Sequence, residues 1–269
     1  MHGLKVSTIA GHLGELLQGR LGPEGPVALI SLPAPDLKLQ VSYRTGPFGL
    51  FQAQGRAITR AHLADLLQAL GCPLRGRFTI HCPFPVGGGG GASTATRLAI
   101  GRLLRPDLTD VAMEQAVLAV EGASDPLLRT RPERLLWASR QARVLAHLPP
   151  LPKMRVVGGF AGPPRLTDPR DAHFPDIADL VAAWPAGCHT AGGVAALATL
   201  SATRTAALRG LDITALQAVA EGTGALGIAI AHTGAAQALL FPPDAQPNQP
   251  LARLAAQGFT NTLSYLIGG

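Results

Sequence analysis

The stretch Pro85-Val86-Gly87-Gly88-Gly89-Gly90-Gly91-Ala92-Ser93-Thr94-Ala95 decides the fold of this 269-residue chain. Alternating apolar residues predict a short strand before it, at 77–82, and an apolar face at helical spacing predicts a helix after it, at 93–104. Glycines let backbone N–H groups approach an anion without a Cβ in the way, and the start of the helix adds unpaired donors. The stretch therefore predicts a loop that holds a phosphate group.

Every residue of the loop up to the start of the helix is a candidate for binding a phosphate-bearing cofactor. These residues are Pro85, Val86, Gly87, Gly88, Gly89, Gly90, Gly91, Ala92, Ser93 and Thr94. The loop has neither the Walker spacing of a P-loop nor the GxGxxG spacing of a dinucleotide fold. Five consecutive glycines are also compatible with a flexible linker, but the position between a strand and a helix favours a binding loop.

The rest of the chain alternates strands and helices without the regular spacing of a doubly wound sheet. A cluster of prolines at 149–152 indicates a connector between two lobes, which we place at 1–148 and 149–269. The predicted fold class is α+β. The other expected strands are 4–9, followed by a turn at 11–15, and 27–32, 37–43, 154–158, 228–231 and 236–241, and the other expected helices are 59–69, 110–120, 192–208 and 213–220.

Composition narrows the possible classes of protein. Hydrophobic residues make up 47% of the chain and charged residues 15%, which allows a sizeable core and excludes a disordered chain. The net charge of +6 comes from scattered arginines, so it favours anionic ligands and not a nucleic-acid partner. The sequence has no membrane span and no secretory signal, and its three cysteines are odd in number. We therefore expect a cytoplasmic protein with reduced thiols.

Three segments together resemble the GHMP kinase superfamily. The second motif of that superfamily is Pro-x-x-x-Gly-Leu-Gly-Ser-Ser-Ala, which the glycine loop matches at Pro85, Gly89, Gly91 and Ser93. The segment 14–19 follows the first strand, as the first motif does, and the segment 224–234 lies where the third motif belongs. The resemblance covers nearly the whole chain. It implies two lobes, an N-terminal one like domain 2 of ribosomal protein S5 and a C-terminal one like ferredoxin, with ATP and Mg²⁺ as cofactors.

Within the superfamily the sequence is most similar to the L-threonine kinases of cobalamin biosynthesis. Those proteins carry Gly-Glu-Leu-Ile-Gln-Gly, Pro-Val-Gly-x-Gly-x-Ala-Ser-Ser-Thr-Ala and Ala-His-Ser-Gly, which correspond to 14–19, 85–95 and 231–234 here. Gly88 and Thr96 replace a lysine and an acidic residue of those enzymes. The resemblance implies phosphorylation of the L-threonine hydroxyl. A kinase of another small alcohol, such as homoserine or a sugar, and a nucleotide-binding protein without catalysis are the alternatives.

The resemblance also implies a catalytic aspartate and a metal-binding glutamate. Glu114 precedes Asp125 by eleven residues, the separation that the superfamily uses for these two groups. Asp125 would accept or orient the proton of the attacking hydroxyl, and Ser93 and Glu114 would hold Mg²⁺. Ser-Asp-Pro is also a common turn, and Glu114 is also explained as an acid near a helix start. Glu121 is a second metal candidate.

Candidates for substrate binding come from the first and third segments: Glu15, Thr233 and Gly234. Glu15 is also explained as a residue that stabilises its own turn. His232 beside Thr233 is more typical of a packed, hydrogen-bonded histidine than of a catalyst. An arginine of the cluster 129–140 is expected to bind a carboxylate, if the substrate has one.

Overall fold

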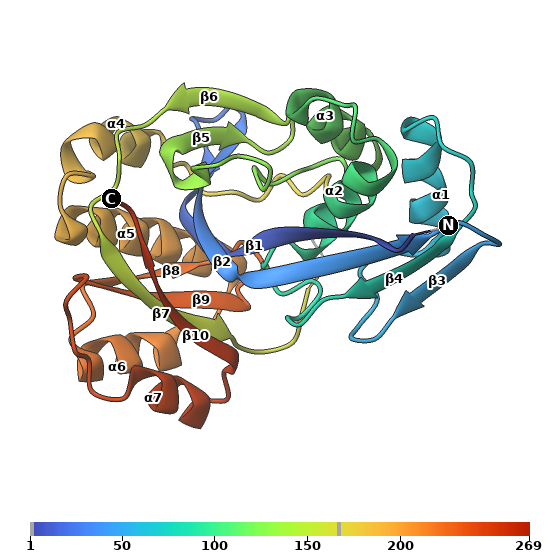
Figure 1. The fold of residues 1–269 in the computed structure, drawn as a ribbon. Coiled ribbons are helices and arrows are strands. Elements are labelled where there is room, and N and C mark those ends of the chain that lie inside the picture. Colours follow the sequence, from blue (N-terminus) through green and yellow to red (C-terminus); the bar gives the residue numbers. More distant parts are fainter. Residues whose placement is uncertain (1–2, 166–167) are drawn as a thin grey trace.

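The computed structural model describes residues 3–165 and 168–269, and within them it has one ten-stranded sheet covered by helices (Figure 1). The strand order is β10-β7-β9-β8-β1-β2-β4-β3, with β5 and β6 continuing from β2. The predicted α+β class is confirmed. The strands are β1 (Lys5–Arg20), β2 (Val27–Arg44), β3 (Gly49–Gln52), β4 (Arg77–His81), β5 (Leu135–Ala138), β6 (Arg143–His147), β7 (Met154–Phe160), β8 (Gly227–Ile230), β9 (Ala236–Phe241) and β10 (Thr260–Ile267). The helices are α1 (Arg60–Ala69), α2 (Ala92–Leu104), α3 (Asp110–Glu121), α4 (Ala178–Gly187), α5 (Ala191–Arg209), α6 (Thr214–Thr223) and α7 (Pro250–Ala256), with a 3₁₀ turn at Pro132–Arg134.

Strand β1 is the centre of the sheet, because it pairs with β2 on one side and β8 on the other. The expected turn at 11–15 is wrong, since β1 runs through it to Arg20. The chain absorbs The two strands expected at 27–32 and 37–43 are likewise one strand, β2. Both strands are irregular where they pass the glycine loop.

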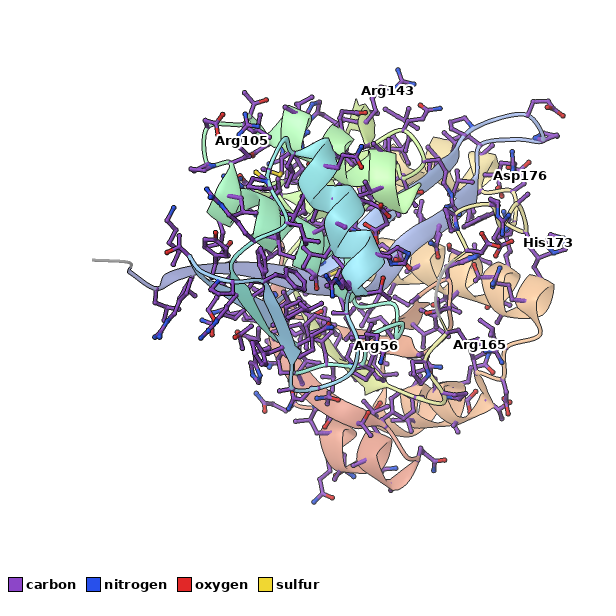
Figure 2. All side chains as sticks on the ribbon, turned by 90° about the vertical axis from the view of Figure 1, so that its right-hand side faces the viewer. Arg56, Arg105, Arg143, Arg165, His173 and Asp176 are labelled. Atoms are coloured by element: carbon purple, nitrogen blue, oxygen red, sulfur yellow. The ribbon has the colours of Figure 1, made fainter. Side chains whose placement is uncertain are left out.

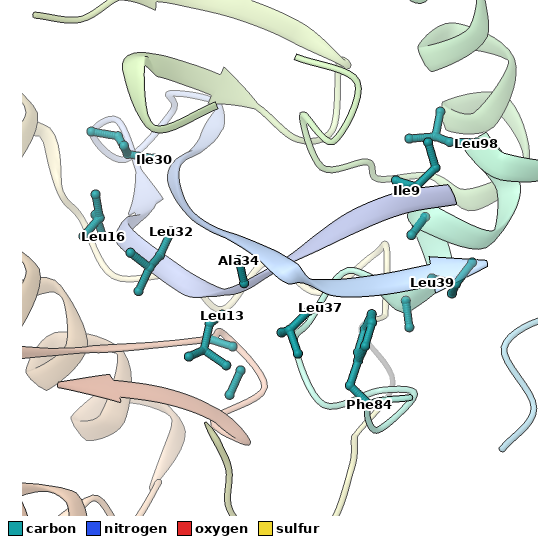
Figure 3. Close-up of a cluster of buried hydrophobic side chains, with 14 of the residues drawn as sticks. Ile9, Leu13, Leu16, Ile30, Leu32, Ala34, Leu37, Leu39, Phe84 and Leu98 are labelled. Carbon is teal, nitrogen blue, oxygen red and sulfur yellow. The ribbon is translucent and has the colours of Figure 1, made fainter. Parts of the chain in front are cut away.

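The hydrophobic core lies along β1 and β2 (Figure 3). Leu13, Leu16 and Leu32 are fully buried, and Phe84 packs into the same cluster from the segment that leads into the glycine loop. Consecutive residues of β1 are buried because helices cover one face of the strand and other strands the second. The core therefore fixes the strand that carries the first motif.

Helices α2 and α3 are antiparallel neighbours. Arg102 near the end of α2 pairs with Asp110 at the start of α3, whereas Thr94 at the start of α2 bonds to Glu121 at the end of α3. Thr109 caps α3 as expected. The end of α3 is thereby placed beside the glycine loop.

The remaining helices cover the C-terminal strands. Helix α5 packs on β1 and β8, and α6 and α7 lie below β7 to β9 in Figure 1. The sequence analysis missed β3, β5, β6, α4, α7 and β10. The sheet continues across the proposed division at 148/149, which stays a prediction. None of the described helices combines the length and the apolar character that a membrane crossing needs.

Candidate active site

The three motif segments, far apart in the sequence, meet at the glycine loop. The backbone N–H of His12 in β1 donates to the Gly90 carbonyl oxygen (3.3 Å), and the N–H of Ala236 donates to the Gly88 carbonyl oxygen (2.7 Å). Strands β1 and β8 pair where Glu15 lies opposite Ile230. The glycine loop is therefore bound to the rest of the protein through its carbonyl groups, and it is not a free linker.

The glycines of the loop are required by its conformation. Gly87, Gly89 and Gly91 have positive φ angles of 79°, 78° and 74°. A Cβ on Gly89 would lie 2.2 Å from the Cβ of Ala231, so the loop and the third motif touch backbone to side chain. Gly91 is the N-cap of α2 and offers no side-chain acceptor. The first N–H groups of α2 are thus available to an anion at the end of the loop.

A groove of about 610 Å³ lies beside the first residues of the loop. Pro85 and Val86 line it from the loop, and Pro164 and Arg56 line it from other segments. The backbone N–H of Arg165 donates to the Gly87 carbonyl oxygen (2.9 Å), which places a second basic residue next to the loop. Figure 2 shows Arg56 and Arg165 in the same part of the molecule. The groove has the size and the mixed lining of a site for a small organic ligand.

Three ionisable side chains form the buried centre of the site. His12 Nε2 lies 3.3 Å from Asp125 Oδ2, and His12 Nδ1 lies 3.5 Å from Glu15 Oε1. His12 and Glu15 are buried, whereas the Asp125 side chain keeps 23% of its surface exposed. The sequence analysis missed His12. Its position in the first segment, three residues before Glu15, was the available signal.

The charges of this centre are set by burial and by each other. Burial lowers the pKa of His12, but Asp125 and Glu15 outweigh it and raise this pKa from 6.5 to about 9. Burial raises the pKa of Glu15 from 4.5 to about 8, with His12 opposing the rise. At neutral pH the centre therefore consists of a charged His12 and a neutral Glu15. Asp125 is left facing an imidazolium.

Stability should depend on pH through this centre. The folded protein holds protons on Glu15 (pKa about 8, against 4.5) and His12 (about 9, against 6.5) that the unfolded chain releases. The free energy of unfolding therefore falls as pH rises, from 4.5 to 8 for Glu15 and from 6.5 to 9 for His12. We expect Glu15→Gln to become more stable than the natural protein by at least about 1.4 kcal/mol at pH 8, the equivalent of one pKa unit. Urea unfolding of both proteins at several pH values measures this, and parallel stability curves would contradict it.

The structure brings Glu121, and not Glu114, to the start of α2. Thr94 Oγ1 donates to Glu121 Oε2 (3.0 Å), and Arg97 Nη1 lies 3.5 Å from Glu121 Oε1. Glu114 instead receives both Arg129 nitrogens, Nε at 2.9 Å and Nη2. The physical reason is the antiparallel packing of α2 and α3: Glu114 lies two helical turns, about 10 Å, before Glu121.

Ser93 at the first turn of α2 is also engaged. Arg97 Nη1 donates both to Ser93 Oγ and to the Ser93 carbonyl oxygen, the latter at 3.1 Å. Burial raises the pKa of Glu121, and the Arg97 charge opposes that rise. Ser93, Arg97 and Glu121 thus form one connected polar group beside the glycine loop.

The third motif closes the site from β8. Gly234 has φ +82° and ends a tight turn in which its N–H donates to the Ala231 carbonyl oxygen (2.8 Å). Thr233 Oγ1 is buried and has no hydrogen-bond partner among the residues that the structure describes. A Cβ on Gly89 would lie 2.8 Å from that oxygen. The Thr233 hydroxyl is therefore free to bind a ligand at the loop.

His232 is a packed histidine, as expected. Its Nε2 lies 3.1 Å from Asp171 Oδ2, and its ring stacks on Phe174 at 4.0 Å. Burial lowers its pKa to about 4, so it is neutral at physiological pH. Asp171 is held by Arg209, whose Nη1 donates to Oδ2 (2.7 Å).

One arginine of the cluster 129–140 reaches the site. Arg140 lies over the Phe174 ring at 5.8 Å, and its Nη2 donates to the Asp168 carbonyl oxygen (3.3 Å). Its Nη1 is buried without a partner within 3–165 and 168–269. Burial lowers the pKa of Arg140, and the charges of Asp171, Asp168 and Asp125 oppose this, which puts Arg140 within electrostatic reach of Asp125. Arg129 is bound to Glu114, and Arg131 donates to the Gly269 carbonyl oxygen.

No family model and no curated protein matches the chain in sequence. Solved structures match it over nearly its whole length. A mevalonate kinase from methicillin-resistant Staphylococcus aureus has a TM-score of 0.63 at 15% identity, and the match covers 99% of each chain. A putative homoserine kinase from Listeria monocytogenes has a TM-score of 0.61 at 17% identity, covering 99% of this chain and 97% of the other. A mevalonate pyrophosphate decarboxylase from Streptococcus pyogenes has a TM-score of 0.62 at 10% identity, covering 99% and 96%.

These similarities establish the fold, which is that of the GHMP kinases, as the motif segments predicted. They do not select a reaction, since a decarboxylase shares the fold with the kinases. The chemistry has to be argued from the side chains of the site.

Proposed function

Starting from the GHMP kinase fold, we propose that this chain is a cytoplasmic kinase that transfers the γ-phosphoryl group of ATP to the hydroxyl of L-threonine, for cobalamin biosynthesis. One observation carries the proposal: the glycine loop and the His12–Asp125 pair lie in one place, with Gly91 against the His12 ring. A phosphate site next to a carboxylate that keeps part of its surface exposed is the arrangement that phosphoryl transfer to an alcohol needs.

The donor site follows from the loop and the groove. The base and ribose of ATP fit the groove at Pro85 and Val86, and the phosphates follow the loop to the first turn of α2. Backbone N–H groups and the helix dipole stabilise the charge there. Arg56 and Arg165 add positive charge at the edge. The predicted binding residues 85–94 keep this role in the proposal.

Asp125 accepts the proton of the acceptor hydroxyl, or orients that hydroxyl for attack. His12 holds the carboxylate through its Nε2 at 3.3 Å and keeps it ionised by its own positive charge. Glu15 supports His12 from the other ring nitrogen. Thr233 and Gly234 line the opposite side, where the Thr233 hydroxyl is a donor for the transferred phosphoryl group.

The resemblance implies Mg²⁺ as well. Ser93 Oγ and the Glu121 carboxylate are the oxygen ligands beside the loop, and Arg97 engages both of them. The residues present therefore do not fit a protein-held Mg²⁺ at this place. In this proposal Mg²⁺ is the ion that accompanies ATP from solution.

Arg140 supports an amino acid as the acceptor. Its buried Nη1 near Asp125 is a charged donor without a partner among the described groups, and a carboxylate would satisfy it. A sugar would leave this cation unpaired. L-Threonine and homoserine both carry the required carboxylate, so a substrate panel has to separate them.

The test is release of ADP by the pure protein with ATP, Mg²⁺ and each candidate acceptor. We expect ADP formation with L-threonine above the control without acceptor, and less with homoserine or a sugar. ATP that raises the melting temperature while no acceptor yields ADP would support a binding protein without catalysis instead.

Replacing Arg140 should separate acceptor binding from ATP binding. For Arg140→Met we expect the KM for L-threonine to rise about 10- to 100-fold, because hydrogen bonds to charged groups contribute about 1.5–3 kcal/mol. The KM for ATP should not change. Arg143→Met is the matched control, since Arg143 bonds only to Gln141 Oε1 at the surface.

L-Threoninamide gives a second comparison, because it lacks the carboxylate. The natural protein should prefer L-threonine over the amide, and Arg140→Met should lose that preference. An unchanged preference would remove Arg140 from the acceptor site while leaving the kinase proposal intact.

A further inference from the structure

The start of α2 contains a cation of the protein itself. Arg97 is 4% exposed, and its Nη1 contacts three oxygens: Ser93 Oγ, the Ser93 carbonyl oxygen at 3.1 Å and Glu121 Oε1 at 3.5 Å. Thr94 Oγ1 fills the second oxygen of Glu121. The guanidinium thus lies between the hydroxyl and the carboxylate that flank the glycine loop.

Helix geometry explains this position. Arg97 is four residues after Ser93, and helical side chains tilt toward the N-terminus, so its guanidinium returns to the first turn. Burial beside Glu121 keeps the pair together, because either partner alone would be a buried, uncompensated charge. Arg97 is therefore a fixed part of the site and not a mobile surface arginine.

A divalent cation would compete with Arg97 for the same oxygens. Binding it between Ser93 and Glu121 would require both Arg97 contacts to break and would place two cations side by side. Elsewhere in the described chain there is no group of three or more histidine, cysteine or acidic side chains that could hold a metal. The ligands that an ion needs are already committed.

We propose that Arg97 takes the place of a protein-bound divalent cation at the start of α2, so that the protein binds ATP without needing Mg²⁺. This inference rests on the proposed ATP site. The guanidinium and the helix N-terminus together supply the positive charge that the phosphates meet at the end of the glycine loop.

Calorimetric titration with ATP, once with excess Mg²⁺ and once with excess EDTA, tests it. We expect the two Kd values to differ by less than about fivefold, the effect of one weak ion pair. Binding that weakens at least about tenfold in EDTA, a loss of about 1.4 kcal/mol, would overturn the inference while leaving the kinase proposal standing. No binding of ATP in either buffer would overturn both.

Arg97→Met tests the residue itself. Its ATP binding in EDTA should weaken at least about tenfold, or about 1.4 kcal/mol, and Mg²⁺ should restore part of it because Ser93 and Glu121 are released. Arg97→Lys keeps the charge and should retain more binding in EDTA than Arg97→Met. Arg102→Met, which removes an arginine of the same helix that pairs with Asp110, should behave as the natural protein in both buffers.

Melting curves without ligand check that each variant is folded. If Arg97→Met does not fold, the comparison of the natural protein in the two buffers still decides the question. Arg97→Met that binds ATP in EDTA as tightly as the natural protein would overturn the assignment.

Discussion

Asp125→Asn should lower kcat about 10²- to 10⁴-fold, the usual contribution of a positioned acid or base. The amide keeps the shape of the side chain but cannot accept the hydroxyl proton. It also leaves His12 without the charge that holds it, since Asp125 is the carboxylate 3.3 Å from Nε2. Steady-state ADP formation with saturating L-threonine measures kcat, and the KM for ATP should stay within a few-fold.

Asp107→Asn is the control for this result. Asp107 lies at the surface and pairs only with Arg105, so its loss should leave kcat unchanged. If Asp125→Asn keeps the natural kcat, Asp125 is not the base. The kinase proposal would then have to rest on positioning and charge stabilisation alone.

Gly89→Ala should both destabilise the protein and weaken ATP binding. Gly89 has φ +78°, and an added Cβ would lie 2.2 Å from the Ala231 Cβ and 2.8 Å from Thr233 Oγ1. The left-handed backbone costs a residue with a side chain about 1–2 kcal/mol, and overpacking costs about 1–3 kcal/mol. We expect the free energy of unfolding to fall by about 2–5 kcal/mol in total. ATP should bind at least about tenfold more weakly, because the loop must move away from the third motif.

Gly22→Ala separates the two causes. Gly22 has φ +80° but nothing lies within 4 Å of its Cβ position, so this variant carries the backbone cost without the contact. Chemical unfolding and calorimetric ATP titration of both variants give the comparison. Equal losses of stability in Gly89→Ala and Gly22→Ala would show that the contact between the loop and the third motif carries no energy.

The local features of the fold could be predicted from the sequence. Alternation in 77–82, helical spacing in 93–104 and the cap at Thr109 are short-range patterns, and the structure has β4, α2 and the capped α3 there. Strands β5 and β6 could not be found in this way, because their pairing partners decide them. β5 is bound to β2, more than a hundred residues away in the sequence.

The site shows the same limit more sharply. Glycine spacing predicts a loop, but nothing in the sequence says that His12 faces Asp125, since a strand and a turn residue come together only through the sheet. The spacing of eleven residues favoured Glu114, whereas helix packing brings Glu121 to the loop and gives Glu114 to Arg129. Arg97 was passed over because only the folded helix turns it back to Ser93.

The position of β1 between β2 and β8 has a consequence for the birth of this protein. While the chain is being synthesised, β2 follows β1 at once, but β8 emerges only after residue 227. Until then one side of β1, with its buried apolar residues, is an open sheet edge. Such long-range pairing is slow and leaves unfinished chains prone to association. The nucleotide pocket therefore forms last, and the nascent chain depends on protection of that edge until the ribosome has delivered its partner.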